Sequence, residues 1–146
     1  MKFFLAFLVA GSLAFCAVDA SAFDRNLSGV WNYDGDTWTI VHVKSDATFV
    51  TSDYVEGVGR MTMKFSGKVV GNGDADQFSY DGKTNPVSFR QNGELCEATF
   101  NFSSFGYVSG EFGGRIIHME ACMISMVLKC PSGNGFKMMG CSGEWK

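Results

Sequence analysis

Histidine and proline are scarce in this sequence, with two residues of each among 146. His42 and His118 lie far apart and lack the paired spacing of metal ligands, so we expect no metal and no cofactor. Twelve Lys and Arg residues against fifteen Asp and Glu residues give a net charge of −3, and no basic cluster interrupts the chain. We therefore expect neither nucleic-acid binding nor attraction to an anionic membrane surface.

Catalytic motifs are also missing. The chain has no GxSxG, no phosphate-binding glycine loop followed by a helix, and no Cys–His arrangement once its cysteines are bridged. Asp34 and Asp36 flank Gly35 and are better explained as turn residues than as an acid–base pair. The segment 72–83 begins like a calcium loop but lacks the central glycine and the final glutamate, which favours a solvated acidic turn. We expect no enzyme.

Long apolar runs are confined to the N-terminus. Lys2 precedes "FFLAFLVAGSLAFCAV", and "ASA" at 20–22 has the small-x-small pattern of a signal-peptidase site. The sequence thus predicts a signal peptide at 1–22 and one secreted domain at 23–146, a length that supports a single core. No later run approaches the roughly 20 apolar residues of a membrane span.

Four cysteines remain after this leader: Cys96, Cys122, Cys130 and Cys141. An even number in an exported domain predicts two disulfides, with three possible connectivities. Cys122 and Cys130 are separated by a run without a turn residue, too long in any regular conformation for a bridge between them. Two connectivities stay open. We favour Cys96–Cys122 with Cys130–Cys141, because "PSGNG" can turn the chain back toward Cys130.

Turn signals recur at roughly ten-residue spacing, among them "DG" at 34–35, "NG" at 92–93 and "SGNG" at 132–135. The runs between them are rich in aromatic, β-branched and Met residues. This pattern predicts an all-β domain, an antiparallel up-and-down β-barrel of about eight to ten strands. The segment 115–130 contains no turn residue. We favour strand there, either one long bent strand or two strands with a bulge, over a helix stopped by Pro131.

Alternation assigns faces to several of these strands. In 61–66 the odd-numbered residues are apolar, and in 96–103 the even-numbered residues are apolar. Closing the sheet would bury the apolar faces and remove the strand edges. Asn26 and Asn101 occupy sequons for N-glycosylation, and Asn101 falls on the polar face, where a glycan is tolerated.

The start of the predicted domain resembles a known group of barrels. Phe23-Asp24 followed by Gly29-x-Trp31 resembles the opening of lipocalins, and "LSGVWNYDGDTWTI" is similar to the start of avidin-like barrels. Both are calycins, so the resemblance implies an up-and-down barrel that holds a small molecule. It does not extend to biotin, because Trp145 is the only tryptophan after Trp38.

We therefore expect a secreted, non-catalytic protein that binds a small apolar or amphipathic ligand inside the barrel. Met and aromatic side chains would bury the ligand. The alternative is a solid barrel whose hairpin loops bind an extracellular protein, as an inhibitor, effector or matrix component does. The expected ligand-binding residues are Trp31, Tyr33, Trp38, Met61, Met63, Phe65, Phe78, Tyr80, Phe89 and Phe100.

Overall fold

The computed structural model describes residues 23, 25–55, 59–111 and 113–146, and the predicted signal peptide at 1–22 lies outside these ranges. Within them the chain has no helix and forms ten antiparallel strands in one sheet, which confirms the all-β prediction. The strands are β1 Gly29–Tyr33, β2 Asp36–Val43, β3 Asp46–Val55, β4 Gly59–Gly71, β5 Gln77–Lys83, β6 Val87–Gln91, β7 Glu94–Ser109, β8 Ile116–Cys130, β9 Gly133–Gly140 and β10 Gly143–Trp145.

Two hairpins follow directly from local sequence. Asp34 and Gly35 form the two-residue turn between β1 and β2, with φ of 50° and 84°. Asn92 and Gly93 do the same between β6 and β7, with φ of 51° and 81°. Asp, Asn and Gly tolerate this left-handed conformation, and its twist matches the twist of the flanking strands. The predicted "DG" and "NG" turns are confirmed.

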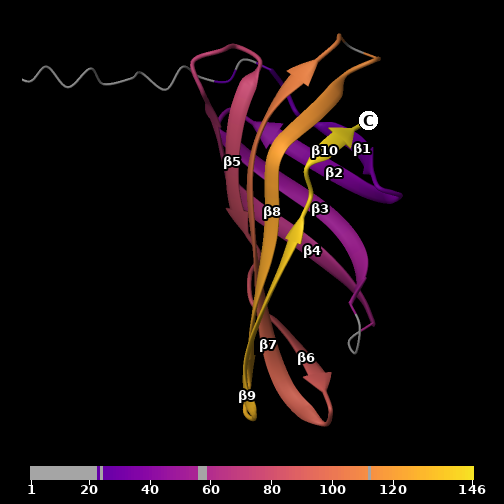
Figure 1. Ribbon diagram of the computed structural model, residues 1–146, viewed down its shortest axis with the longest axis vertical. Helices are drawn as coiled ribbons and strands as arrows, with labels where there is room; N and C mark the ends of the chain where they lie inside the picture. The colour runs from indigo at the N-terminus through magenta and orange to yellow at the C-terminus, as the bar shows by residue number, and fades with distance from the viewer. Residues whose placement is uncertain (1–22, 24, 56–58, 112) are drawn as a thin grey trace, which may run out of the picture.

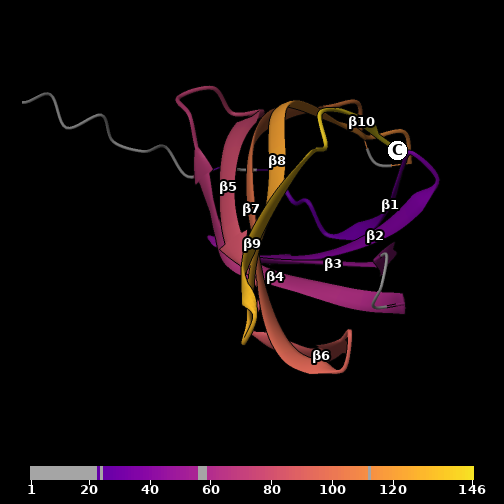
Figure 2. The same ribbon diagram turned by 60° about the horizontal axis from the view of Figure 1, so that its bottom comes forward.

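The sheet curls until its two end strands approach each other (Figure 2). The strand order is β1-β2-β3-β4-β5-β7-β8-β10, with β6 on β7 and β9 on β8. No continuous ladder closes the described part of the sheet. Instead the Asn32 N–H donates to the Lys146 carbonyl at 2.6 Å, and the Lys146 N–H donates to the Asn32 carbonyl at 3.1 Å. This single pair of backbone bonds links β1 to the residue after β10.

Four strands continue beyond the curled part (Figure 1). The long strands β7 and β8, of 16 and 15 residues, run on together with β6 on one edge and β9 on the other. We call this β6-β7-β8-β9 sheet the extension. The prediction of strand over 115–130 is confirmed: β8 is one long strand, and it carries a bulge opposite Phe105 and Gly106.

Six large rings form a cluster at the centre of the curled part. Phe102 lies at their centre, 1 % exposed, with ring centroids of its five neighbours 5.2–6.2 Å away. The apolar faces predicted for 61–66 and 96–103 both point into this core. The five neighbours are Trp38, Phe49, Phe65, Tyr80 and Trp145.

The disulfides join Cys96 to Cys130 and Cys122 to Cys141, with Cα atoms 4.4 and 4.8 Å apart. Two bridges and the exclusion of Cys122–Cys130 are confirmed, but the favoured connectivity is wrong. The turn after Cys130 is so tight that Cys130 pairs with Gly133. As a result β9 runs back along β8 and delivers Cys141 to Cys122, while Cys130 lies opposite Cys96 on β7.

Candidate functional site

The interior of the curled sheet is occupied by the side chains expected to line a ligand cavity. Those farthest inside are at most 7 % exposed and pack on one another. The Tyr80 hydroxyl lies 3.2 Å from the carbonyl oxygens of both Ala47 and Phe65, and burial raises its pKa. The interior members of the predicted set are Trp31, Trp38, Met61, Met63, Phe65, Phe78, Tyr80 and Phe100.

Trp31, the tryptophan of the calycin-like motif, anchors the segment that precedes β1. Its Nε1–H donates to the Leu27 carbonyl at 2.9 Å, and the Leu27 N–H donates to Nδ1 of His42 at 3.2 Å. The Arg115 guanidinium lies over the indole, 5.3 Å from its centroid. These contacts explain Trp31 as a structural residue that holds the segment before β1 against the sheet.

The two remaining predicted residues lie at the border of the core. Tyr33 is half-buried and stacks on Trp145 with ring centroids 5.5 Å apart, and its hydroxyl donates to the Ser142 carbonyl at 3.0 Å. Phe89 is half-buried on β6 and packs against the core from the extension. Tyr33 therefore ties β1 to the C-terminal segment, near the single backbone link between β1 and Lys146.

An open apolar groove of about 340 Å³ lies between the extension and the ends of β3 and β4. The wall formed by the extension contributes side chains from β7, β8 and β9, and Met63 of β4 faces it. Four of the nine lining residues are methionines, so we call it the methionine groove. It is lined by Asp53, Tyr54, Met63, Phe100, Ile124, Met126, Lys137, Met138 and Met139.

Strand register explains why these residues meet. Met126 of β8 pairs with Phe100 of β7 and with Lys137 of β9, and Ile124 pairs with Met139. Directly paired residues of antiparallel strands point to the same face of the sheet. The inner face of the extension therefore continues the apolar core outward, and Met126 and Met139 are diagonal neighbours on it.

The groove carries one exposed cation. Lys137 lines it, and no carboxylate among the described residues lies within salt-bridge distance of its ammonium group. The carboxylate of Asp53 lines the same groove and accepts the N–H of Tyr54 at 2.6 Å. The arrangement offers an apolar wall with a positive charge at its solvent side, which suits a ligand that has an apolar body and a polar end.

A polar row crosses the outer face near the chain end. The Ser109 Oγ lies 2.7 Å from Nε2 of His118, whose Nδ1 lies 3.8 Å from the Glu144 carboxylate. The hydrogen bond and charge of Lys146, 2.9 Å away, lower the pKa of Glu144. Tyr107 stacks on His118 with centroids 4.5 Å apart. These residues are cross-strand neighbours, and Glu144 is already paired with Lys146. We therefore interpret the row as surface contacts that stabilise strand pairing.

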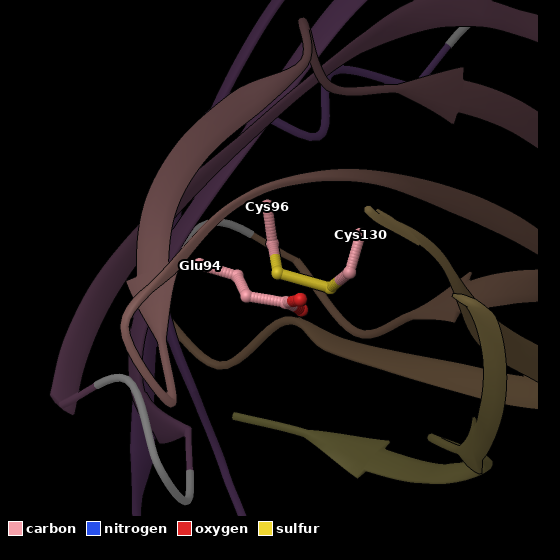
Figure 3. A group of neighbouring side chains, drawn as sticks. All are labelled: Glu94, Cys96 and Cys130. Carbon is pink, nitrogen blue, oxygen red and sulfur yellow. A yellow bond between two sulfur atoms is a disulfide. The ribbon is translucent and has the colours of Figure 1, made fainter. Parts of the chain in front are cut away.

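Glu94, Cys96 and Cys130 bring a carboxylate and two sulfur atoms within 4.8 Å of one another (Figure 3). The two sulfur atoms form the disulfide, so neither is a thiolate that binds metal. Ser132 donates its hydroxyl hydrogen to Glu94 at 2.6 Å. While the bridge is intact, this group serves the end of the extension as a covalent clamp.

Both predicted glycosylation sites are exposed. Asn26 precedes β1, and its Oδ1 accepts the Ser28 N–H at 2.8 Å. Asn101 lies in the middle of β7, on the outer face of the sheet.

No family model, no curated protein and no solved structure matches this chain. None of the described residues forms a helix of the length and apolarity that crossing a membrane requires.

Of the predicted ligand-binding residues, only Met63 and Phe100 line the methionine groove. Sequence reasoning missed its other walls, because the strand that supplies Lys137 and Met139 was not located. The signal was present as "FKMM" at 136–139, three large apolar residues and one lysine between two glycines. Only the register of β9 on β8 determines that Lys137 and Met139 lie beside Met126 and Ile124.

Proposed function

We propose that this protein is exported and binds a small amphipathic ligand, without catalysis, in the methionine groove. The observation that carries the proposal is the pairing of an apolar, Met-rich wall with the exposed ammonium group of Lys137. Two disulfides support an extracellular location, where such bridges persist. The curled antiparallel sheet supports a distant calycin-like architecture.

The groove supports ligand binding better than the interior does. Around Phe102 the ring centroids lie 5.2–6.2 Å apart, which is the spacing of rings in contact. The groove is open, and its 340 Å³ is near the lower end of ligand sites, which span roughly 300–1,000 Å³. Flexible thioethers let one wall repack around ligands of different shape.

An anionic amphiphile fits the charge of this wall. Its apolar chain would lie on Phe100, Met126 and Met139, and its carboxylate would approach Lys137. Each buried methylene contributes about 0.8 kcal/mol. That contribution changes Kd about fourfold per methylene, until the chain outgrows the groove. An exposed ion pair adds only about 0.2–1 kcal/mol, so the head group gives at most about a fivefold preference.

The test is calorimetric titration with straight-chain alkyl carboxylates of increasing length, compared with alkyltrimethylammonium ions of equal length. We expect saturable 1:1 binding, a stepwise gain with length that levels off, and a preference for the carboxylates. Lys137→Gln should remove the preference while leaving the length dependence.

Met139→Asp should abolish binding, because it introduces a charge into the apolar wall. The side chain is 50 % exposed, so we expect the variant to fold. Met123→Asp is the matched control: the same change on β8 of the same sheet, at a side chain 44 % exposed on the other face. Absence of saturable binding for every length, or equal losses from the two variants, would refute the proposal.

A second candidate function is binding of an extracellular protein. One observation favours it: among the described strands β9 pairs with β8 alone, and nearly all of its residues are exposed. A free edge of this kind accepts an added strand from a partner. The Lys137 N–H faces β8, so the N–H of the preceding residue, Phe136, points to the free edge. Proline substitution at Phe136 would weaken such strand addition, whereas Lys137→Gln would leave it intact.

A further inference from the structure

The outer face of the extension carries an apolar patch that meets the methionine groove at Met138, a groove-lining residue that the strand register turns to the outer face. Met123 and Val127 of β8 and Phe136 and Met138 of β9 point to this face, because their register alternates with that of the inner-face residues of the same two strands. Phe136 is 61 % exposed and Met138 57 % exposed. We call these four residues the outer patch.

Asn101 lies on the same face, next to the outer patch. It pairs with Ser125 of β8, which in turn pairs with Met138 of β9. Met123 and Val127, two residues on either side of Ser125, are therefore its diagonal neighbours. Two strand spacings separate Asn101 from Met138, roughly 10 Å. The amide side chain is exposed, as is Ser103, which completes the sequon.

We propose that Asn101 carries an N-linked glycan and that this glycan covers the outer patch. The inference rests on export of the chain and not on ligand binding in the groove. In the modification, Nδ2 of Asn101 bonds to C1 of the first N-acetylglucosamine. The bond between C1 and the diphosphate of a lipid-linked oligosaccharide breaks, and the amide proton leaves with the diphosphate.

Two features of the face favour this occupant. Sugar rings present C–H faces to apolar side chains and hydroxyl groups to water, so they cover Phe136 and Met138 while keeping the surface wet. The residues between Asn101 and the patch are small or polar, with Ser125 in the same row and Thr99 in the next. No bulky side chain of these rows stands between the glycan attachment point and the patch.

The glycan would also hinder self-association through the exposed edge of the sheet. The outer patch lies beside the edge strand β9, and an exposed apolar edge strand is a template for pairing with another chain. A glycan attached two strands away obstructs a second copy that approaches this edge. Asn26 lies before β1, distant from the extension in sequence and topology, and has no such role.

The experiment uses the full chain secreted from a eukaryotic host, with intact mass measured before and after removal of N-glycans by an amidase that leaves aspartate. Asn101→Gln and Ser103→Ala remove the same sequon by different changes, and Asn26→Gln is the matched control. Hydrogen peroxide then reports side-chain access, since exposed methionines oxidise faster, and peptide mass spectrometry locates each sulfoxide.

We expect an occupied Asn101, and a roughly twofold or greater rise in oxidation of Met138 and Met123 in both sequon variants, in line with their greater access. Met139, on the groove face, should oxidise at the same rate in every variant. Concentration-dependent self-association should appear with the sequon variants and disappear again when Phe136→Ser is added. Asn26→Gln should change none of these readings.

An unmodified Asn101 in the secreted protein would overturn the proposal. Equal oxidation of Met138 with and without the glycan would overturn its covering role even where Asn101 is occupied. Neither result bears on alkyl carboxylate binding, which depends on Met139 and Lys137 on the opposite face. The two proposals therefore fail separately.

Discussion

Replacing Phe102 with alanine tests whether the curled sheet has a solid interior. The ring is 1 % exposed and contacts five other rings, more than any other aromatic side chain among the described residues. Those neighbours come from β2, β3, β4, β5 and β10, which means that Phe102 links most of the sheet across its centre.

The expected loss is large. Truncating a buried Phe to Ala costs about 3–5 kcal/mol in free energy of unfolding, through lost transfer and an unfilled cavity. Loss of edge-to-face pairs with Phe49, Phe65 and Tyr80 places Phe102→Ala toward the upper end of that range, because each such pair adds about 0.5–1.5 kcal/mol. For a chain of this size the change corresponds to a fall in Tm of roughly 12–20 °C.

Equilibrium unfolding in urea measures the loss, with Phe136→Ala as the matched control. Phe136 is 61 % exposed, and its truncation should change the free energy by less than about 0.5 kcal/mol. Benzene should partly restore the Tm of Phe102→Ala, because a ring-lined cavity binds a ring. A loss below about 1 kcal/mol for Phe102→Ala would refute the solid interior and return the ligand site to the barrel centre.

Three further predictions follow from single contacts. Burial lowers the pKa of His42 from its ordinary 6.5, so the stability contributed by the neutral imidazole should be full above pH 6.5 and fall as the pH drops below that value. In unfolding curves His42→Asn should flatten this pH dependence. An NMR titration midpoint of His42 at or above 6.5 would contradict the prediction. The Cys96–Cys130 and Cys122–Cys141 bridges close loops of 34 and 19 residues, so removing them should lower the free energy of unfolding by about 3.8 and about 3.2 kcal/mol. Non-reducing peptide mapping checks both pairings. A Cβ at Gly67 would lie 1.8 Å from a backbone oxygen of β5, so Gly67→Ala should lower Tm strongly, whereas Gly140→Ala, which meets nothing within 4 Å, should not.

Local patterns predicted much of this fold because each depends on a few neighbouring residues. The alternation over 61–66 and 96–103 predicted the buried faces of β4 and β7, and turn chemistry predicted the hairpins at 34–35 and 92–93. The absence of a turn residue over 115–130 predicted strand there, and the structure has a single strand, β8. What these patterns do not contain is which strand lies beside which, since pairing is a property of the whole sheet.

The disulfides illustrate that local patterns do not determine strand pairing. The turn after Cys130 was recognised, but its tightness was not, and a slip of a few residues in a hairpin changes every partner along it. With Cys130 opposite Gly133, β9 runs along β8 as far as Gly140, and Cys141 reaches Cys122. The same sequence with a wider turn would have allowed the favoured bridge to Cys130.

The missed bridge and the missed site have one cause. The register that delivers Cys141 to Cys122 also pairs Met139 with Ile124 and Lys137 with Met126, which builds the wall of the methionine groove. It simultaneously turns Phe136 and Met138 to the opposite face, beside Asn101. Reduction of Cys122–Cys141 should therefore loosen groove and outer patch together, while reduction of Cys96–Cys130, at the far end of the extension, should leave the groove residues Ile124 and Met139 paired.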